Sequence, residues 1–438
     1  MILITYFEKF VSNVQPSEER IAAISDSHTT VRKHLLEDAK LKFPIVDSLL
    51  SGSYARHTSI DPIKDADIIL VLEETKVSDD KKTPNPRHVL EDLKAALDDF
   101  YDQVNLETQR RSIQVFLPED DVRMDIVPSI APDGKEKQLN VPDYEQGKWI
   151  KSHPYEHITF ATNTNKENGG RFVRVAKAMK WWKIEKLVKE KAPKSFLLEV
   201  IVAYNMDSKA SNLCEAFAGT LKNILSAYKT NRQNGTVPKV PDPALPDDND
   251  LADTCGWTAN DFIYFYDQVS ALSDVAEKAN DAKTSKDDTV KLWKSAFGDV
   301  YPASLTEEEE RALKSASSQL APLRKSKYPY KVKISARLAR KQDGAPFDTY
   351  RSDGRKLEKG LWIRFSIDEI NVPQPYEIKW TVRNHGREAR ERKQLFHQRL
   401  GGRENWETTA YTGHHFMDCE VLKNGRVVAM ARHIVNIK

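Results

Sequence analysis

One stretch near the N-terminus constrains the fold more than any other part of the chain. A small-residue turn, Gly52-Ser53, is followed a dozen residues later by two aspartates, Asp65 and Asp67, and then by the apolar run 68–72. A short apolar run of this kind is typical of a buried strand. Side chains on a strand alternate between its two faces, so Asp65 and Asp67 are predicted to point the same way.

The residue types in this stretch indicate a particular chemistry. Two carboxylates on one face repel each other unless a cation lies between them, and hard oxygen ligands suit Mg²⁺ or Mn²⁺. Gly52 allows a backbone to approach a phosphate closely, and Ser53 offers a hydroxyl and an N–H group at a predicted helix start. A phosphate cradle beside a divalent-metal pair indicates phosphoryl or nucleotidyl transfer.

A third carboxylate lies in a later strand pattern. Residues 104–127 predict two strands, and Asp125 lies in the second of them, followed by Ile-Val-Pro. An aspartate buried among strand formers has to be paired or ligated, and a salt bridge to Arg123 would explain Asp125 alone. With Asp65 and Asp67 it completes a set for two Mg²⁺ ions. One ion activates the attacking hydroxyl, and the other neutralises the triphosphate and the leaving pyrophosphate.

The whole-chain properties set wider limits. The 438 residues allow two or three domains, and a net charge of +2 says little about partners. No apolar run is long enough to predict a membrane span, and the apolar first residues lack the basic lead and cleavage site of a signal peptide. The three cysteines are far apart and form neither a zinc spacing nor a disulfide framework. These features favour a protein of the reducing cytoplasm.

Helical patterns dominate the middle of the chain. Apolar spacing and capping residues predict helices over 17–42, 87–102, 170–191, 258–280, 285–296 and 305–321, with one more beginning at Ser195. The helix over 170–191 carries basic residues at three-residue spacing, among them Lys180, which would suit phosphate oxygens or form a solvated face. Ser195 can cap its helix and also contact a phosphate. The segment 233–256 is rich in proline and aspartate and predicts a surface loop or strap.

The composition changes near residues 322–328, and the tail predicts β-structure. From Tyr328 onward there are 22 Lys and Arg against 13 Asp and Glu. This asymmetry indicates an anionic partner such as a nucleotide or nucleic acid, although a merely solvated basic domain explains it as well. Several short strands and an Asn424-Gly425 hairpin signal predict a small sandwich. The pair His414-His415 has no third spaced metal ligand and is interpreted as surface or ligand-contact histidines.

Taken in order, these features resemble a known family. Gly52-Ser53, Asp65-x-Asp67, Asp125, Lys180 and Ser195-Phe196 are similar to the motifs of the bacterial cGAS/DncV-like nucleotidyltransferases. This is the CD-NTase (SMODS) group of the polymerase-β-like superfamily.

Two further stretches resemble parts found in relatives. The segment Asp242-Pro243…Asn249 resembles a strap of oligoadenylate-synthase relatives. The tail resembles the AGS-C sensor domain, through the motifs Trp380-x-Val-x-Asn384-x-Gly386-x-x-Ala389 and Glu407-x-Thr-x-Tyr411-x-Gly413-His414.

The resemblance implies an α+β fold. A polymerase-β-like nucleotidyltransferase core with a mixed sheet and a helical lobe is expected over residues 1–321. A linker over 322–328 and a small β-sandwich-like, basic AGS-C sensor domain over 329–438 would follow.

The resemblance also implies an activity, a cyclic oligonucleotide synthase of anti-phage CBASS defence. This enzyme would join NTPs into a cyclic di- or trinucleotide with release of pyrophosphate, and a separate effector protein would sense the product. ATP would be a substrate, and whether GTP or other NTPs are also substrates stays open. A nucleotide or nucleic acid is the expected ligand of the tail, and no membrane is involved.

The family's site residues carry over to matching positions. Asp65, Asp67 and Asp125 would bind two Mg²⁺ or Mn²⁺ ions, and Asp125 can also receive the acceptor proton. Gly52 and Ser53 would hold the donor triphosphate. Lys180 and Ser195 would contact its phosphates, and Phe196 would stack on a base.

Three alternatives stay open at this point. The chain could make linear oligoadenylate, modify a protein or tRNA with a nucleotide, or bind nucleotide or RNA without catalysis. Base choice, linkage and ring size depend on side chains that only folding brings together.

Overall fold

The computed structural model describes most of the chain. The described residues are 3–37, 39, 41–63, 65–73, 84–101, 105–117, 122–316, 330–352, 354–384, 388–389, 392, 394, 396–423 and 426–438. The expected linker over 322–328 therefore lies outside the described residues.

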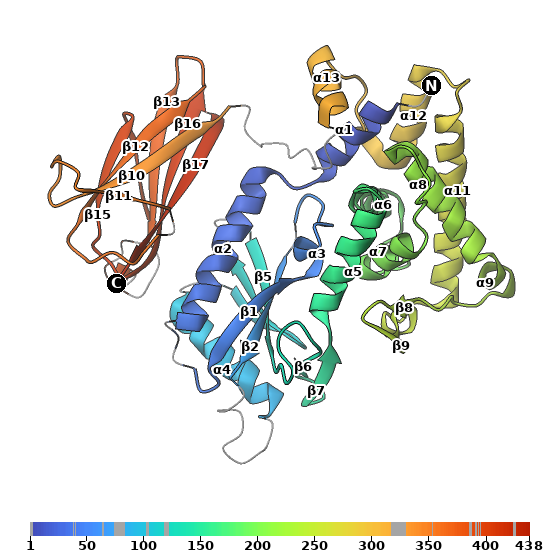
Figure 1. Cartoon of the computed structure of the whole chain (residues 1–438), viewed down its shortest axis with the longest axis horizontal. Helices are drawn as coiled ribbons and strands as arrows, with labels where there is room; N and C mark the ends of the chain where they lie inside the picture. The colour runs from blue at the N-terminus through green and yellow to red at the C-terminus, as the bar shows by residue number, and fades with distance from the viewer. Residues whose placement is uncertain are drawn as a thin grey trace.

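The described helices are concentrated in the first three quarters of the chain (Figure 1). They are α1 (Ile4–Val14), α2 (Glu18–Glu37), α3 (Gly52–Ala55), α4 (Pro86–Phe100), α5 (Pro154–Glu167), α6 (Arg171–Lys186), α7 (Ser195–Tyr204), α8 (Leu213–Ala227), α9 (Lys229–Asn234), α10 (Leu251–Thr254), α11 (Ala259–Asn280), α12 (Lys286–Phe297) and α13 (Glu307–Ala316), with a 3₁₀ turn at Gly298–Val300.

The strands belong to an N-terminal sheet, two short hairpins and a C-terminal sandwich. They are β1 (Ile45–Ser51), β2 (Ala66–Leu72), β3 (Asn105–Thr108), β4 (Ile113–Leu117), β5 (Val122–Ser129), β6 (Leu139–Asp143), β7 (Lys148–Ser152), β8 (Pro241–Asp242), β9 (Leu245–Asp250), β10 (Val332–Ala339), β11 (Asp348–Tyr350), β12 (Trp362–Ile370), β13 (Glu377–Asn384), β14 (Phe396–Gly401), β15 (Glu404–Thr408), β16 (Gly413–Lys423) and β17 (Arg426–Ile437).

The N-terminal sheet is mixed, as expected. Its order is β1-β2-β5-β4-β3, in which β2 and β5 run parallel and the other neighbours antiparallel. Helices α2 and α4 contribute Val31, Leu35, Leu90 and Leu93 to the apolar cluster that also buries the sheet residues Ile68 and Leu70. The segment 104–127 forms three strands rather than the two expected, because a turn closed by the Gln109 N–H and the Ser112 carbonyl separates β3 from β4.

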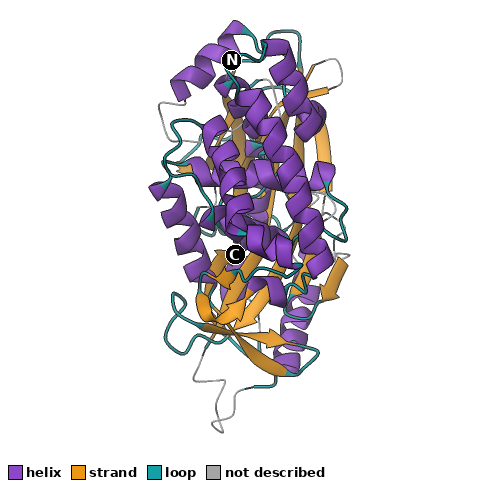
Figure 2. Cartoon of the chain, turned by 90° about the vertical axis from the view of Figure 1, so that its right-hand side faces the viewer, coloured by secondary structure: helices purple, strands orange, loops and turns teal. Residues whose placement is uncertain are grey.

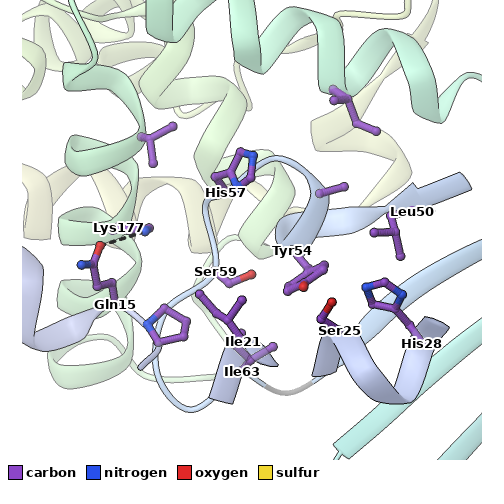
Figure 3. A pocket seen from close by; sticks show the side chains of 14 residues that line it. Gln15, Ile21, Ser25, His28, Leu50, Tyr54, His57, Ser59, Ile63 and Lys177 are labelled. Carbon is purple, nitrogen blue, oxygen red and sulfur yellow. Dashed lines mark hydrogen bonds between the residues drawn. The ribbon is translucent and has the colours of Figure 1, made fainter. Parts of the chain in front are cut away.

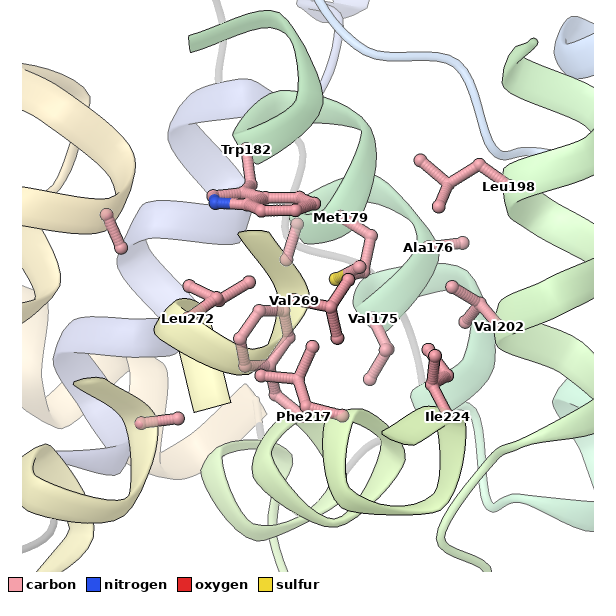
Figure 4. Packing of buried hydrophobic residues seen from close by; sticks show 14 of the residues in the cluster. Val175, Ala176, Met179, Trp182, Leu198, Val202, Phe217, Ile224, Val269 and Leu272 are labelled. Atoms are coloured by element: carbon pink, nitrogen blue, oxygen red, sulfur yellow. The ribbon is translucent and has the colours of Figure 1, made fainter. Parts of the chain in front are cut away.

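The helical lobe encloses its own core. Helices α6, α7, α8 and α11 meet around Val175, Met179, Phe217 and Val269, which are fully buried (Figure 4). In the side view the helices stack in front of the strands (Figure 2).

The first helix, α1, was not predicted. Its Phe10 ring stacks on Phe297 of α12 with ring centroids 4.1 Å apart. The apolar opening of the chain is therefore core of the helical lobe.

Helix boundaries differ from the predictions at several points. The helix expected over 170–191 ends at Lys186, and α7 begins at Ser195 with Lys194 as its N-cap residue. Ser195 thus does not cap α7, which corrects the prediction. A capping box begins α13, because the Thr306 and Glu309 side chains each accept a hydrogen bond from the other residue's backbone N–H. Helices α5 and α8 had no counterpart in the sequence predictions.

The C-terminal strands form the predicted sandwich. One sheet has the order β11-β10-β12-β15 and the other β14-β13-β16-β17, and all pairs are antiparallel. The buried side chains of Phe365, Trp380 and Cys419 lie in the core between them. Strands β16 and β17 form a hairpin, although its Asn424-Gly425 turn lies outside the described residues.

Two long ion pairs connect the sandwich to α2. Arg432 lies 3.8 Å from Asp26, and Lys356 lies 3.6 Å from Glu37. Partly exposed ion pairs of this length contribute little free energy, about 0–1 kcal/mol each. Among the described helices, none is long and apolar enough to cross a membrane.

Candidate active site

Gly52 is pressed against Asp67. Ser51, the last residue of β1, pairs with Asp67 on β2, and the chain then turns into the short helix α3 at Gly52. Gly52 has a φ of +68°, and a Cβ atom on it would lie 1.7 Å from Oδ2 of Asp67. Only glycine fits this position, because a side chain would meet the carboxylate and strain the backbone.

The parallel pairing of β2 and β5 brings the second and third aspartates together. Asp67 is the register partner of Asp125. Gln114 on β4 donates a hydrogen bond from Nε2 to Oδ1 of Asp125 at 3.1 Å, which fixes that carboxylate. Asp65 lies just before β2 and is close enough to both for its charge to act on them.

The electrostatics of the three carboxylates are unfavourable without a cation. Burial, followed by the charges of Asp65 and Asp125, raises the pKa of Asp67 to about 7. Burial likewise raises the pKa of Asp125, although Gln114 opposes the shift. A buried cluster of like charges that holds a proton near neutral pH would lose it to a divalent cation.

The three carboxylates have the chemistry to bind a hard cation, but they are not arranged as a complete set of metal ligands. Within the described part of the chain, no three His, Cys, Asp or Glu side chains already form a metal-holding group. The carboxylate oxygens of Asp65, Asp67 and Asp125 are of the type that Mg²⁺ and Mn²⁺ prefer. Their role as ligands is therefore a prediction supported by their chemistry.

A large groove of about 1030 Å³ opens beside the carboxylates. Ser53 and Asp65 line this groove, and so do Lys183 and Ser195. Ser53 Oγ lies 3.1 Å from Ser59 Oγ. Lys183 Nζ donates to Ser195 Oγ at 2.8 Å, so an ammonium and a hydroxyl face the groove together. Sequence reasoning did not single out Lys183 among the basic residues of its helix.

Lys180 also borders this groove, but its ammonium is bound inside the protein. The side chain is 4% exposed, and Nζ donates to Oε1 of Glu199 at 2.5 Å and to the Thr58 carbonyl at 3.1 Å. Arg56 binds both oxygens of Glu199, at 3.0 and 3.1 Å. Burial alone would raise the pKa of Glu199, but the charges and hydrogen bonds of Lys180 and Arg56 lower it to about 2.

This network was missed by sequence reasoning. Arg56 ends α3, Lys180 belongs to α6 and Glu199 to α7. It joins the helix that begins at Gly52 to the helical lobe. The only sequence signal was a glutamate inside the apolar pattern Leu197-Leu198-Glu199-Val200, where a buried carboxylate needs a partner.

Phe196 contacts Arg56 on one side and, through His157, is connected to the strap residue Asp242. The guanidinium of Arg56 lies 4.7 Å from the Phe196 ring centroid, and the rings of His157 and Phe196 are also 4.7 Å apart. His157 Nε2 lies 2.7 Å from Oδ1 of Asp242, whose Oδ2 accepts from Asn249 at 2.9 Å. The Asp242…Asn249 strap is thus the β8–β9 hairpin. Stacking of Phe196 on a base stays a prediction.

A second cavity, of about 540 Å³, lies behind α3. Figure 3 shows Tyr54, His57 and Ser59 on its wall, and the buried ammonium of Lys177 reaching toward Gln15 Oε1 at 3.4 Å. The three aspartates are not among the side chains that line it. The carboxylates are therefore not part of this cavity.

Sequence comparisons agree with these features. The second messenger oligonucleotide or dinucleotide synthetase (SMODS) domain matches residues 1–165, and the adenylyl/guanylyl and SMODS C-terminal sensor domain matches residues 313–438. A cyclic AMP-AMP-AMP synthase of an Acinetobacter species is 31% identical over 320 residues, which cover 71% of this chain and 89% of that protein. A cyclic AMP-AMP-GMP synthase of Enterobacter hormaechei is 22% identical over 68% of this chain and 91% of its own.

Solved structures share the fold. Escherichia coli CdnC, determined with ATP, has a TM-score of 0.53 at 18% identity and covers 68% of this chain and 98% of its own. The CD-NTase CdnG of Bradyrhizobium diazoefficiens, determined in complex with GTP, has a TM-score of 0.54 at 16% identity and covers 72% of this chain and 97% of its own. With its paired aspartates, its glycine turn and a close relative along most of its length, the chain is a nucleotidyltransferase that belongs to the cGAS/DncV-like family, the CD-NTases.

Proposed function

We propose that this enzyme joins NTPs, with ATP as the principal substrate, into a cyclic trinucleotide messenger. The observation that carries the proposal is the in-register pairing of Asp67 with Asp125 directly beside the glycine turn at Gly52. The relative at 31% identity is a cyclic AMP-AMP-AMP synthase, which supports adenine bases and a ring of three.

In the proposed reaction a ribose hydroxyl of the acceptor attacks the α-phosphorus of the donor NTP. A new P–O bond forms, the bond to the β-phosphate breaks, and pyrophosphate leaves. Bound Mg²⁺ would supply charge neutralisation and an activated nucleophile. Asp65, Asp67 and Asp125 would hold two such ions, and Asp125 would also receive the hydroxyl proton.

The residues that line the groove support a site for the donor phosphates there. Gly52 and Ser53 would hold the triphosphate through backbone N–H groups and a hydroxyl. The pair Lys183 and Ser195 would contact the phosphates directly. Lys180 would position the phosphate site indirectly, through its hydrogen bonds to Thr58 and Glu199. Its burial supports this role in place of the direct phosphate contact that the sequence predicted.

The larger organisation is also proposed. Residues 1–321 would form the nucleotidyltransferase core with its helical lobe, and 329–438 the sensor domain. In anti-phage defence a separate effector protein would recognise the cyclic product.

Product analysis tests this function. The purified protein is incubated with each NTP and with all four together, in Mg²⁺ or Mn²⁺, and the products are treated with phosphatase and weighed by mass spectrometry. We expect a phosphatase-resistant product with the mass of three cyclised AMP units. The variant Asp67→Asn should make none, whereas the exposed Asp99→Asn on α4 serves as the matched control.

Other results would identify the rivals. A phosphatase-sensitive product would indicate linear oligoadenylate. Label from ATP found only in protein or tRNA of an added extract would indicate a modifying enzyme. Phage protection unchanged in Asp67→Asn would indicate a non-catalytic sensor.

A further inference from the structure

The sensor-domain motif residues lie inside the C-terminal sandwich. Trp380 is 1% exposed, and Asn384 donates a hydrogen bond from Nδ2 to a backbone carbonyl at 2.7 Å. His415 is 5% exposed, and its Nε2 lies 2.7 Å from the Tyr411 carbonyl oxygen, so its interpretation as a surface residue was wrong. Gly386 of the same motifs lies outside the described residues. These motif residues stabilise the sandwich, so a surface for a large ligand has to be sought on its outside.

The sheet β11-β10-β12-β15 has an outward face that combines tryptophan and arginine. Side chains alternate along each strand, and residues paired across neighbouring strands share a face. On β12, Ile363 is buried in the core, so Trp362 and Arg364 on either side of it point outward. Arg337 of β10 and Trp406 of β15 are both register partners of Arg364 and point outward with it. We call the four outward residues the Trp-Arg face.

The Trp-Arg face lies on the side of the sandwich that is turned away from α2. The other sheet faces α2, because Arg432 of β17 lies 3.8 Å from Asp26. The next residue on β17, His433, points into the core, with its ring centroid 5.6 Å from that of Phe365. In Figure 1, β11 and β15 lie on the side of the sandwich farther from α2. Arg337 is exposed and the other three side chains of the face are partly exposed, so a large ligand can reach them.

Two arginines lie directly opposite each other on this face. Arg337 and Arg364 are register partners on neighbouring strands. Like charges in this position destabilise a sheet, and a phosphate held between two guanidinium groups would remove the repulsion. Glu404 compensates only in part, because its carboxylate lies 3.8 Å from Arg364 and its side chain is 52% exposed. The arginine pair therefore favours an anionic ligand.

The two tryptophans lie on either side of Arg364. Trp362 is two residues away on the same strand, and Trp406 lies on β15 with its ring centroid 5.9 Å from the guanidinium. Trp362 and Trp406 are diagonal neighbours on adjacent strands, a relation that spaces residues about 7–8 Å apart and leaves room for one base on each ring. Aromatic rings beside cations on an open sheet face are typical of proteins that stack single-stranded bases.

We propose that the Trp-Arg face binds a single-stranded nucleic acid. Its phosphates would contact Arg337 and Arg364, and two of its bases would stack on Trp362 and Trp406. A duplex fits poorly, because its bases are already stacked on each other. A flat anionic membrane would meet the exposed carboxylate of Glu404 on the same face, whereas a flexible strand can avoid it. The proposal concerns the tail alone and stands whatever product the catalytic centre makes.

Fluorescence anisotropy of the full-length protein tests the proposal. The probes are fluorescein-labelled single strands of RNA or DNA, about ten nucleotides long, which is within the range that single-strand-binding modules cover. EDTA is present to disfavour metal-dependent binding at the carboxylates. The competitors are the unlabelled strand, a duplex of the same length, inorganic polyphosphate and phosphatidylserine vesicles. We expect saturable binding that only the unlabelled strand displaces efficiently, and the tighter of the two probes identifies the preferred sugar.

Matched aromatic variants locate the site. Trp362→Ala and Trp406→Ala should each weaken binding about fivefold to a hundredfold, the range that stacking of one base contributes. Trp362→Phe, which keeps an aromatic ring, should restore most of the affinity. Tyr155→Ala, which removes an exposed ring from α5, should leave binding unchanged.

The salt dependence of binding tests the arginines. Each phosphate contact to a single strand contributes about 0.7 to the slope of log affinity against log salt concentration. Arg337→Gln should therefore reduce the magnitude of this slope by about 0.7. Arg311→Gln, which removes an exposed charge from α13, should leave the slope unchanged.

Several results would overturn the proposal. They are saturation by neither probe at low salt, displacement by duplex, polyphosphate or vesicles as efficient as by the unlabelled strand, equal weakening by Trp362→Ala and Tyr155→Ala, and an unchanged salt slope in Arg337→Gln. Efficient displacement by the vesicles would identify a membrane surface instead. Circular dichroism melting of each variant establishes that it is folded.

Discussion

Replacing Glu199 tests whether the buried ion network supports the catalytic turn. Glu199 is 3% exposed and forms ion pairs with two cationic side chains, Arg56 at 3.0 Å and Lys180 at 2.5 Å. Glu199→Gln keeps the volume but leaves both cations without a counter-charge. Removing one partner of a buried pair costs about 3–5 kcal/mol. With an unfolding entropy of about 2.1 cal/mol/K per residue over residues 1–321, a loss of that size corresponds to a decrease of about 4–7 °C in Tm.

The assay is thermal unfolding followed by circular dichroism, together with pyrophosphate release. The matched control is Glu307→Gln, because Glu307 and its partner Arg311 are 90% and 79% exposed. Loss of this exposed ion pair should change the free energy of unfolding by less than about 1 kcal/mol. We also expect Glu199→Gln to lose activity at temperatures where it is still folded, since Arg56 ends the helix that starts at Gly52.

The pH dependence gives the prediction a second readout. The pKa of Glu199 is lowered from 4.5 to about 2, so its contribution to stability is complete above pH 4.5 and is lost as the pH falls toward 2. The difference in Tm between the wild type and Glu199→Gln should therefore be constant from pH 8 to pH 5 and shrink below. A variant that melts within about 1 °C of the Glu307→Gln control, which is less than about 1 kcal/mol for a core of residues 1–321, would refute the reasoning.

Three further outcomes follow from the site. Gly52→Ala should abolish pyrophosphate release in a folded protein, because its Cβ would lie 1.7 Å from Oδ2 of Asp67; near-normal rates would contradict this close approach. Mg²⁺ affinity, measured by calorimetry, should fall as the pH drops below 7, since the Asp67 carboxyl, with its pKa raised to about 7, must lose a proton to bind metal. An affinity equal at pH 6 and pH 8 would argue against Asp67 as a ligand. Lys183→Ala should raise the KM for NTP about tenfold with a smaller effect on kcat, because a charge-assisted phosphate contact is lost, and an unchanged KM would remove Lys183 from the proposed groove contacts.

The local pattern around the catalytic turn could be predicted because it depends on neighbours in sequence. A strand with aspartates at its start predicts where Asp65 and Asp67 lie, and the glycine before it indicates a close approach. The strand around Asp125 was predicted from its β-branched neighbours. The local sequence pattern therefore determined the strands around these aspartates, the candidate carboxylates and the β-rich tail, whereas the mixed type of the sheet was implied by the family resemblance.

Contacts between distant segments depended on tertiary structure. The parallel register that pairs Asp67 with Asp125 is set by how β2 and β5 pack, which no spacing reveals. Lys180 looked like a phosphate contact on a basic stripe, yet packing of α6 on α7 buries it against Glu199. Burial strengthens charge interactions and penalises unpaired polar groups, so only the folded environment decided which basic residues remain available to a ligand.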